Sequence, residues 1–283
     1  MTDMPDRYAV IGHPVEHSRS PEIHAAFARQ TGQRLSYDRL PAAPDAFVAV
    51  ARGFFEAGGA GLNVTLPFKG DAAAFADRLT ERAVRAGAVN TLARRDDGLL
   101  LGDNTDGAGL LNDLSARVGL SIAGARILIL GAGGAVRGVV PVLMGQSPTR
   151  LQIANRSPDK AERIARDFAD LGSIQACSLA EVGPGWDLII NAISAGLGGE
   201  MPALPTHLLD GAGRAYDMLY ANGPTPFMQW VGQHSDIPCS DGFGMLVEQA
   251  AESFFVWRGV RPDTAPVIQS LRPGAGPAST RDR

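Results

Sequence analysis

The sequence predicts an α/β protein with two domains, and three observations carry that prediction. Short β-type runs alternate with helical segments along most of the 283 residues, a length sufficient for one large or two ordinary domains. The run Ile127–Leu130 is apolar at every position, as expected of a parallel strand covered by helices on both faces. A glycine-rich turn and a helical segment follow this run directly, which makes it the clearest strand–turn–helix unit of the chain.

Composition and charge exclude several classes of protein. Hydrophobic residues make up 45% and charged residues 20% of the chain, which is typical of a globular protein. The net charge of −4 is too small, and the basic residues are too scattered, to predict a nucleic-acid partner. No apolar run approaches the roughly 20 residues that span a bilayer, and the polar N-terminus lacks a signal-peptide core. We therefore expect a soluble, cytoplasmic protein with no membrane partner.

The two cysteines, Cys177 and Cys239, do not have the spacing of a metal site. Because disulfides are rare in cytosolic proteins, reduced thiols are favoured over a single bridge. No cluster of histidine and cysteine accompanies them, so the sequence predicts no bound metal.

Glycine and proline mark the ends of the expected elements in the first half of the chain. Pro21 is suited to the first turn of a helix, and the pair Gly58-Gly59 is suited to end one. Asp97-Gly98 joins two β-type runs and is a strong hairpin signal. The expected elements are strands at 8–11, 35–40, 61–65, 89–92 and 99–101, and helices at 21–30, 45–57, after 67, and at 106–118.

The second half shows the same alternation. Ser157 is a typical helix cap, and Pro158 is a typical first helical residue. The expected elements are strands at 127–130, 150–154, 188–190 and 215–218, and helices from the glycine-rich turn to about 144, from 158, and at 244–258. The tail from Pro273 is rich in Pro, Gly and Ala and is expected to be frayed.

The glycine-rich turn has the features of a phosphate-binding loop. It consists of Gly131, Ala132, Gly133, Gly134 and Ala135. Glycine lets the backbone approach a pyrophosphate closely, and the following helix presents free N–H groups to the anion. The Rossmann-type fingerprint is imperfect, because Val136 occupies its third glycine position, although Gly138 lies near enough to permit close helix packing. A glycine turn in some other α/β protein is the alternative.

The residues after the next strand indicate which dinucleotide would bind. An NAD site usually carries an Asp or Glu at the end of that strand to bind the ribose 2′-hydroxyl. This strand ends instead in Asn155, Arg156 and Ser157, with Lys160 one helical turn later. A guanidinium, a hydroxyl and an ammonium suit a 2′-phosphate, and arginine can also stack on adenine. The sequence therefore favours NADP(H) over NAD, with a solvent-exposed basic face as the alternative interpretation.

Polar residues are unusually dense at the expected strand ends of the first hundred or so residues. They are Ser18, Ser20, Asn63, Thr65, Lys69, Asn90 and Asp106. Each has an ordinary alternative role, since Ser20 could only cap a helix, Lys69 could be a solvated lysine and Asn90 could be a turn residue.

Together and in this order, these residues resemble the shikimate dehydrogenase family, and the similarity runs from Tyr8 to about Leu271. The motifs are Ser-x-Ser-Pro at 18–21, Asn-Val-Thr-x-Pro-x-Lys at 63–69, Gly-Ala-Val-Asn-Thr at 87–91 and Asp-Asn-Thr-Asp-Gly at 103–107. They continue with Gly-Ala-Gly-Gly-Ala at 131–135, Asn-Arg-Ser at 155–157, Tyr-Asp-Met-Leu-Tyr at 216–220 and Asp-Gly-Phe-Gly-Met-Leu-Val-Glu-Gln at 241–249. So many separated motifs in register make chance similarity very improbable.

The resemblance implies reversible, NADPH-dependent reduction of 3-dehydroshikimate to shikimate, on the route to chorismate and the aromatic amino acids. By similarity, the substrate carboxylate is bound by Ser18, Ser20 and Tyr220. The ring hydroxyls are expected to lie against Thr65, Asn90 and Gln249, and Asn63 is also counted among the substrate-binding residues. The family's catalytic pair is matched by Lys69 and Asp106.

The chemistry of carbonyl reduction also favours a lysine–carboxylate pair, independently of the resemblance. The reaction moves a hydride to carbon and a proton to oxygen. A lysine near that oxygen can donate the proton or stabilise the developing alkoxide, and an adjacent carboxylate can orient the lysine. Which of Lys69 and Asp106 carries the proton is not decided by the sequence.

The resemblance also assigns the cofactor contacts. Besides the glycine-rich loop and the 155–160 segment, it places Met218 and Gly242 near the nicotinamide and adds Glu81. In one departure, the family's Asn-Ala-Thr-Ser run is Asn-Ala-Ile-Ser at 191–194, so Ile193 cannot supply the threonine hydroxyl. In a second, Asn-Arg-Thr becomes Asn-Arg-Ser at 155–157, which keeps the hydroxyl.

A two-domain layout follows from the resemblance. Residues 1–106 plus 242–283 are expected to form a substrate domain with a mainly parallel sheet, and 107–241 an inserted Rossmann-type NADP-binding domain. The active site is expected in the cleft between them, where the carboxyl ends of strands converge. Closure of that cleft would exclude water from hydride transfer.

Two other functions remain as alternatives. The first is a quinate/shikimate dehydrogenase paralogue that uses NAD or both cofactors. The pocket near Ser18, Ser20 and Tyr220 would decide between shikimate and quinate, because quinate carries an extra hydroxyl on the ring carbon that bears its carboxylate. A non-catalytic dinucleotide-sensing protein on the same fold would have no reason to keep both Lys69 and Asp106. The sequence does not decide the oligomeric state, and a homodimer stays open.

Overall fold

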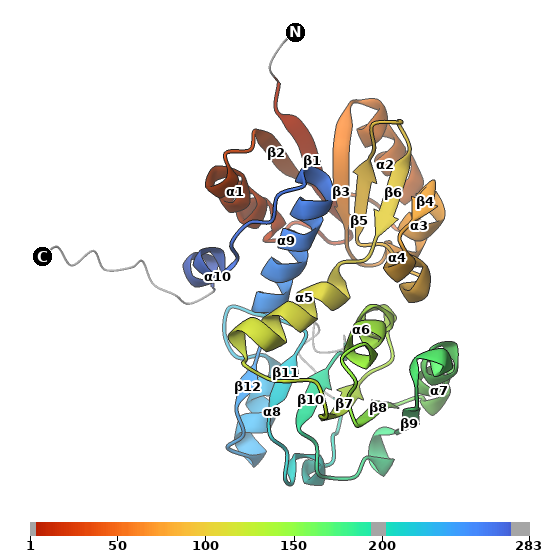
Figure 1. The fold of residues 1–283 in the computed structure, drawn as a ribbon, viewed down its shortest axis with the longest axis vertical. Coiled ribbons are helices and arrows are strands. Elements are labelled where there is room, and N and C mark those ends of the chain that lie inside the picture. Colours follow the sequence, from red (N-terminus) through yellow and green to blue (C-terminus); the bar gives the residue numbers. More distant parts are fainter. Residues whose placement is uncertain (1–3, 194–201, 273–283) are drawn as a thin grey trace, which may run out of the picture.

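The computed structural model describes residues 4–193 and 202–272, which fold around two six-stranded sheets. Figure 1 shows the two sheets in separate lobes, with α5 (Asp106–Asn112) lying between the lobes and α9 (Phe243–Arg258) running alongside it. The predicted α/β class is therefore confirmed. The expected tail from Pro273 and residue Ser194 lie outside the described residues.

The first sheet has the strand order β2-β1-β3-β5-β6-β4. Its strands are β1 (Asp6–Gly12), β2 (Leu35–Pro41), β3 (Gly59–Val64), β4 (Arg78–Leu79), β5 (Thr91–Arg94) and β6 (Leu100–Asp103). β1 pairs in parallel with β2 and β3, whereas β5 pairs antiparallel with both β3 and β6. The β5–β6 hairpin turns at Gly98, whose φ of 83° suits glycine, as the Asp97-Gly98 pair predicts.

Five helices accompany this sheet along the chain before residue 113. They are α1 (Ser20–Thr31), α2 (Phe47–Glu56), α3 (Lys69–Phe75), α4 (Glu81–Ala86) and α5. The expected helix at 106–118 differs in its second half, because the chain passes at Asp113 into a π-helical turn that ends at Arg117. α9 and α10 (Ala265–Leu271) return from the C-terminal part of the chain, and both pack against α1.

The second sheet is parallel at every pairing and has the order β9-β8-β7-β10-β11-β12. Its strands are β7 (Arg126–Leu130), β8 (Arg150–Asn155), β9 (Ile174–Ser178), β10 (Leu188–Asn191), β11 (Ala215–Asp217) and β12 (Cys239–Ser240). From β7 the chain adds β8 and β9 on one side of that strand, and it then returns to add β10, β11 and β12 on the opposite side. This reversal makes β7 and β10 the switch point at which doubly wound sheets bind dinucleotides.

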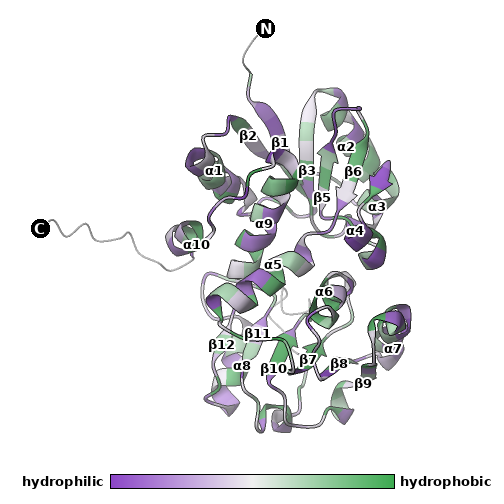
Figure 2. Ribbon diagram, in the orientation of Figure 1, coloured by the Kyte–Doolittle hydropathy of each residue, from purple (hydrophilic) through white to green (hydrophobic). Residues whose placement is uncertain are grey.

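Helices and short turns surround the second sheet. They are α6 (Gly134–Met144), α7 (Pro158–Asp167) and α8 (Pro226–His234), with 3-10 turns at Ala169–Leu171, Leu179–Glu181 and Thr206–Leu209. The four apolar residues Ile127–Leu130 are fully buried, and β7 and β10 are hydrophobic along most of their length (Figure 2). Ser157 occupies the N-cap position of α7 as predicted, but its side chain makes no capping hydrogen bond.

Small residues let α5 approach both lobes closely. A Cβ atom on Gly109 would lie 2.7 Å from the Cβ of Gln249 on α9, and one on Gly107 would lie 2.4 Å from the Gly138 carbonyl oxygen on α6. Gly138 thus permits close helix packing, as expected, and the helix that packs against it is α5. The first turn of α5 is therefore fixed between the helix that follows the glycine-rich loop and the helix that returns to the first lobe.

His24 is an unusual core residue of the first lobe. It is fully buried on α1, and neither ring nitrogen has a hydrogen-bond partner among the described residues. Its ring stacks on Tyr37 with centroids 4.3 Å apart and an interplanar angle of 7°. Burial lowers the pKa of His24 from 6.5 to about 3, because the charged imidazolium would lose its hydration.

Replacing this histidine should make the protein more stable. In His24→Phe the two unpaired polar atoms disappear while an aromatic ring is kept, so the free energy of unfolding should rise by about 1–3 kcal/mol. The wild type should lose stability as pH falls from about 6.5 toward 3, by up to about 1.4 kcal/mol per pH unit, because only the unfolded chain binds the proton. Denaturant unfolding at neutral and mildly acidic pH checks both effects. Equal stability of the two proteins at both pH values would contradict the prediction.

Candidate active site

Lys69 and Asp106 form an ion pair at the start of two helices. Lys69 is the first residue of α3 and Asp106 the first residue of α5, and their Nζ and Oδ2 atoms lie 2.5 Å apart. The Asp106 side chain is only 9% exposed and that of Lys69 23% exposed, so the pair is partly shielded from water. The backbone N–H of Asp106 donates to Asn104 Oδ1 at 3.1 Å, which fixes the first turn of the helix.

Asn90 holds the other oxygen of this carboxylate. Its Nδ2 donates to Asp106 Oδ1 at 2.8 Å and lies 3.4 Å from Gln249 Oε1. Gln249 Nε2 donates to the Leu246 carbonyl at 2.8 Å within α9. The structure thus brings four of the predicted substrate-site residues into one hydrogen-bonded group, which is made by Lys69, Asn90, Asp106 and Gln249.

Asn63 lies beside this group on β3, and it is 5% exposed. Its Nδ2 reaches the Asn90 carbonyl at 3.2 Å, and its Oδ1 accepts from the Tyr37 hydroxyl at 2.7 Å. Burial raises the pKa of Tyr37 well above its usual value, so this hydroxyl stays protonated and can donate. The amide of Asn63 is therefore already fixed by the protein on both sides.

Of the two predicted carboxylate-binding serines, Ser18 lies in the loop after β1 and Ser20 is the first residue of α1. The Ser18 hydroxyl donates to Ser20 Oγ at 3.1 Å, and the Ser18 carbonyl accepts from Arg39 Nε at 3.0 Å and Nη2 at 2.6 Å. Thr65 follows the neighbouring strand β3, and a Cβ on Gly12 would lie 2.3 Å from its Cγ2 atom. Because β1 and β3 are parallel, Gly12 and Thr65 meet at the carboxyl edge of the sheet, where small-molecule sites form, and the chain runs on from Gly12 to the two serines.

Met218 and Gly242 come together although they lie far apart in the sequence. The Gly242 N–H donates to the Leu219 carbonyl at 2.9 Å, and a Cβ on Gly242 would lie 2.3 Å from the Met218 carbonyl oxygen. The ring of Tyr220 packs on Phe243, with centroids 6.0 Å apart. Burial raises the pKa of Tyr220, so the hydroxyl remains a hydrogen-bond donor at neutral pH.

The glycine-rich loop has the backbone that a pyrophosphate requires. Gly131 has a φ of 109°, and a Cβ there would lie 2.9 Å from the Ala192 carbonyl oxygen, so only glycine fits. A Cβ on Gly133 or Gly134 would meet no atom within 4 Å, so the loop faces open space at the N-terminus of α6. The Gly131 N–H donates to the Ala154 carbonyl at 2.8 Å, which ties the loop to the end of β8.

The predicted phosphate-binding group is exposed at that same strand end. Arg156, Ser157 and Lys160 are exposed, and Asn155 Nδ2 donates to the Ser157 carbonyl at 2.9 Å. Glu81 is separate from the loop in the sequence and lies at the first residue of α4. It lines a hollow of about 480 Å³ between the two lobes, together with Arg82 of the same helix.

Several residues of this region were not singled out by the sequence. They are Tyr37, Arg39, Thr91, Thr105 and Ser253. Thr91 and Thr105 adjoin the predicted Asn90 and Asp106 within the quoted motifs, and Ser253 lies one helical turn after Gln249, so adjacency could have indicated them. Tyr37 and Arg39 carry no such signal, because only the pairing of β1 with β2 brings them to the site.

Neither a membrane span nor a metal centre is found in the described parts of the chain. None of the helices within 4–193 and 202–272 has the length and apolar character needed to cross a bilayer. Across the same residues, His, Cys, Asp and Glu side chains do not gather in groups of three or more that could hold an ion. Cys177 and Cys239 are both free thiols, as predicted.

The sequence matches three family models that together follow most of the chain. They are the shikimate dehydrogenase substrate binding domain at residues 10–92, shikimate/quinate 5-dehydrogenase at 113–197, and the shikimate 5′-dehydrogenase C-terminal domain at 242–272.

Individual relatives agree with these matches. A shikimate dehydrogenase (NADP(+)) from Methylococcus capsulatus is 54% identical over 268 residues, which cover 94% of this chain and 96% of the relative. The crystal structure of an Ael1 enzyme from Pseudomonas putida is 42% identical with a TM-score of 0.90, covering 96% of this chain and 100% of the other. Shikimate 5-dehydrogenase from Thermus thermophilus, in complex with NADP(H) and shikimate, is 33% identical with a TM-score of 0.82, covering 92% and 96%. Because such relatives span nearly the whole chain, the protein belongs to the shikimate dehydrogenase family.

Proposed function

We propose that this protein is an NADP-dependent shikimate dehydrogenase, which reversibly reduces 3-dehydroshikimate to shikimate. The observation that carries the proposal is the Lys69–Asp106 pair, 2.5 Å apart and oriented by Asn90, in a chain 54% identical to a shikimate dehydrogenase (NADP(+)). Residues 1–106 with 242–283 are assigned to substrate binding, and 107–241 to the cofactor. The free thiols of Cys177 and Cys239 support a cytoplasmic location.

Lys69 is suited to act on the substrate carbonyl. Its ammonium lies 2.5 Å from a carboxylate that is itself fixed by Asn90, so the N–H donors point in a defined direction. In the direction of reduction, this ammonium donates a hydrogen bond to the carbonyl oxygen and stabilises the negative charge that develops there. Asp106 keeps the ammonium in place, and the pair supplies the proton that the new hydroxyl requires. Partial burial strengthens both interactions.

The polar residues around the pair suit a carboxylate and three hydroxyls. Ser18 and Ser20 present adjacent hydroxyls where the chain enters α1, and Tyr220 adds a protonated phenol that can donate to the same carboxylate. Thr65, Asn90 and Gln249 are assigned to the ring hydroxyls, and Asn63 supports Asn90 from the neighbouring strand. A buried polyol needs this many partners, because each unpaired polar group on either side would weaken binding.

The second lobe fits a dinucleotide with a 2′-phosphate. The open backbone at Gly133 and Gly134 and the free N–H groups of α6 suit the pyrophosphate. Arg156, Ser157 and Lys160 are exposed beside this loop, and the strand end at 154–157 carries no carboxylate that would repel a 2′-phosphate. Met218 and Gly242 are assigned to the nicotinamide side, and Glu81 to the hollow between the lobes. When bound, NADPH supplies the hydride for the reduction.

The proposal is tested by following NADPH absorbance. Oxidation of NADPH is expected when 3-dehydroshikimate is added to the purified protein, and reduction of NADP when shikimate is added. Binding of the dinucleotide with no change of absorbance in either direction would support a dinucleotide-sensing protein and overturn the proposal.

The carboxylate assignment gives a separate prediction for Ser18. Ser18→Ala should raise KM for shikimate by roughly tenfold, because a hydrogen bond to a charged group is worth about 1.5–3 kcal/mol. kcat should change little, since the carboxylate does not alter during hydride transfer. Steady-state kinetics at saturating NADP separates the two constants. An unchanged KM would show that Ser18 does not hold the carboxylate.

A further inference from the structure

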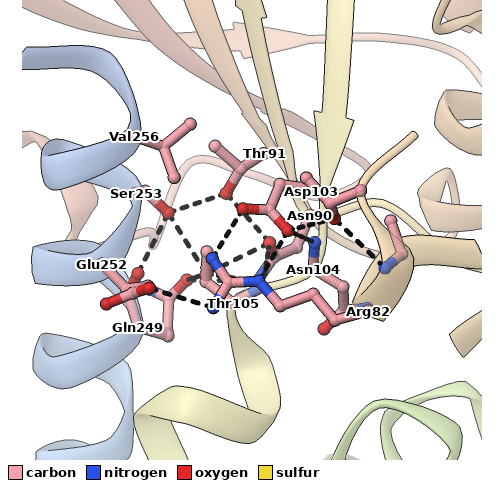
Figure 3. Close-up of polar contacts among 12 residues, drawn as sticks. Arg82, Asn90, Thr91, Asp103, Asn104, Thr105, Gln249, Glu252, Ser253 and Val256 are labelled. Carbon is pink, nitrogen blue, oxygen red and sulfur yellow. Dashed lines mark hydrogen bonds and ion pairs between the residues drawn. The ribbon is translucent and has the colours of Figure 1, made fainter. Parts of the chain in front are cut away.

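Ser253 is a buried hydroxyl for which the proposed chemistry has no use. It lies on α9, one turn after Gln249, and none of its surface is exposed. Its Oγ atom lies 2.7 Å from Thr91 Oγ1 and 3.2 Å from Thr105 Oγ1, and it accepts from Asn63 Nδ2 at 3.0 Å. Its single proton goes either to Thr91 Oγ1, which leaves the Thr91 proton for Asn90, or to the Gln249 carbonyl 3.0 Å away. One atom thus joins β3, β5, the segment before α5, and α9. Figure 3 shows Ser253 on α9 facing Thr91 and Thr105.

The groups around Asn90 fix how its amide is turned, and two of them are hydroxyls that contact Ser253. Asn90 Oδ1 accepts from the Thr105 backbone N–H at 2.9 Å and from Thr91 Oγ1 at 2.9 Å. Because a backbone N–H can only donate, the oxygen must face the Thr105 N–H, and Nδ2 must face Asp106 Oδ1 at 2.8 Å. The Thr91 hydroxyl supports this orientation when it donates to Oδ1. A flipped amide would set an oxygen against the carboxylate. The position of Asp106, and of the Lys69 ammonium bound to it, therefore depends on this orientation.

Gln249 is held against the same group by weaker contacts of its own. Its Oε1 atom lies 3.4 Å from Asn90 Nδ2 and 3.5 Å from Thr105 Oγ1, distances near the limit for a hydrogen bond. The contacts of Ser253 to this group, one turn along the helix, are shorter. Ser253 consequently does more than Gln249 to fix the distance between α9 and Asn90.

We propose that Ser253 is a positioning residue of the active site. Its hydroxyl fixes α9, with Gln249, against the Thr91–Asn90–Thr105 group, and through Asn90 it fixes the catalytic Lys69–Asp106 pair. This inference rests on the proposed function and concerns the same site. Buried polar groups that satisfy one another in a low dielectric restrict each other strongly, so the loss of one loosens the others.

The test compares Ser253→Ala with a variant that weakens the same helix without touching the network. Val247 is fully buried on α9 and belongs to an apolar cluster with Phe27 and Phe254, so Val247→Ala serves as the control. Ser253→Ala should lower kcat for 3-dehydroshikimate by roughly tenfold, since misplacing reacting groups by 1 Å can cost about 10²-fold. KM for NADPH should stay within about twofold of the wild type. Val247→Ala should lower the melting temperature but keep kcat.

A second variant keeps the test decisive if Ser253→Ala does not fold. Thr91→Val retains the β-branched shape and removes the hydroxyl, and it should lower kcat to a similar extent. When both fold, the double variant should lose less than the sum of the two single losses, because the contact between Ser253 and Thr91 is common to both. The inference is overturned if kcat stays near the wild-type value in the folded single variants. A wild type that does not oxidise NADPH with 3-dehydroshikimate would instead overturn the proposed function.

Discussion

Lys69→Ala should lower kcat for 3-dehydroshikimate reduction by about 10²- to 10⁴-fold, the range typical of a positioned proton donor. The substrate KM should change by only a few-fold, because the ammonium acts mainly on charge that develops in the transition state. Steady-state kinetics with saturating NADPH measures both constants. Near-normal turnover by the folded variant would show that Lys69 has no catalytic role.

Lys69→Arg is the matched comparison, and the composition of the chain makes it informative. Lysine occurs only at positions 69 and 160, against 24 arginines, so this protein uses arginine for nearly all of its positive charges. Arginine keeps the charge and can pair with Asp106, but its guanidinium is planar, larger and a far weaker acid than an ammonium. We expect Lys69→Arg to remain at least about 10²-fold slower than the wild type. Recovery of full activity would mean that only the charge matters.

Arg156→Glu should change the cofactor preference of the protein. Loss of a charged hydrogen bond worth about 1.5–3 kcal/mol lowers kcat/KM for NADPH by roughly 10- to 150-fold, and repulsion of the 2′-phosphate adds to this loss. kcat/KM for NADH should stay within a few-fold, because NADH has no 2′-phosphate at that position. Kinetics with both cofactors at saturating 3-dehydroshikimate measures the ratio.

Arg166→Glu is the control for the change in net charge. Arg166 lies near the other end of α7, and its side chain is 69% exposed. The Arg166→Glu variant should leave the preference for NADPH over NADH unchanged. If both variants reduced NADPH use equally, the effect would be one of general charge, and the assignment of Arg156 to the 2′-phosphate would be wrong.

The parts of the fold that the sequence predicted are those with strong local signals. The strand at Ile127–Leu130 was predicted because burial on both faces leaves an uninterrupted apolar run. The loop at Gly131 was predicted because a positive φ and a close approach to Ala192 both demand glycine. By contrast, β4 and β12 have two residues each, which is too short to show the hydrophobic periodicity of a strand. The π-helical turn after Asn112 also has no local sequence signal, and only the packed structure reveals it.

The site residues divide in the same way, into those predicted from local motifs and those whose role depends on tertiary packing. Lys69, Asn90 and Asp106 were predicted from motifs, and the structure joins them by hydrogen bonds. Ser253 looks like any serine in a helix interior, and its importance follows only from α9 being buried on the side that faces β5. His24 likewise gave no signal, because its lack of partners depends on the aromatic rings that the fold places around it.

The central claim is that one site combines a shikimate pocket with an NADP-specific loop. The most direct test measures kcat/KM for shikimate and for quinate, each with NADP and with NAD. We expect the highest value for shikimate with NADP, because Arg156, Ser157 and Lys160 suit the 2′-phosphate and relatives that span nearly the whole chain are shikimate dehydrogenases (NADP(+)). A higher kcat/KM with NAD, or with quinate, would contradict it.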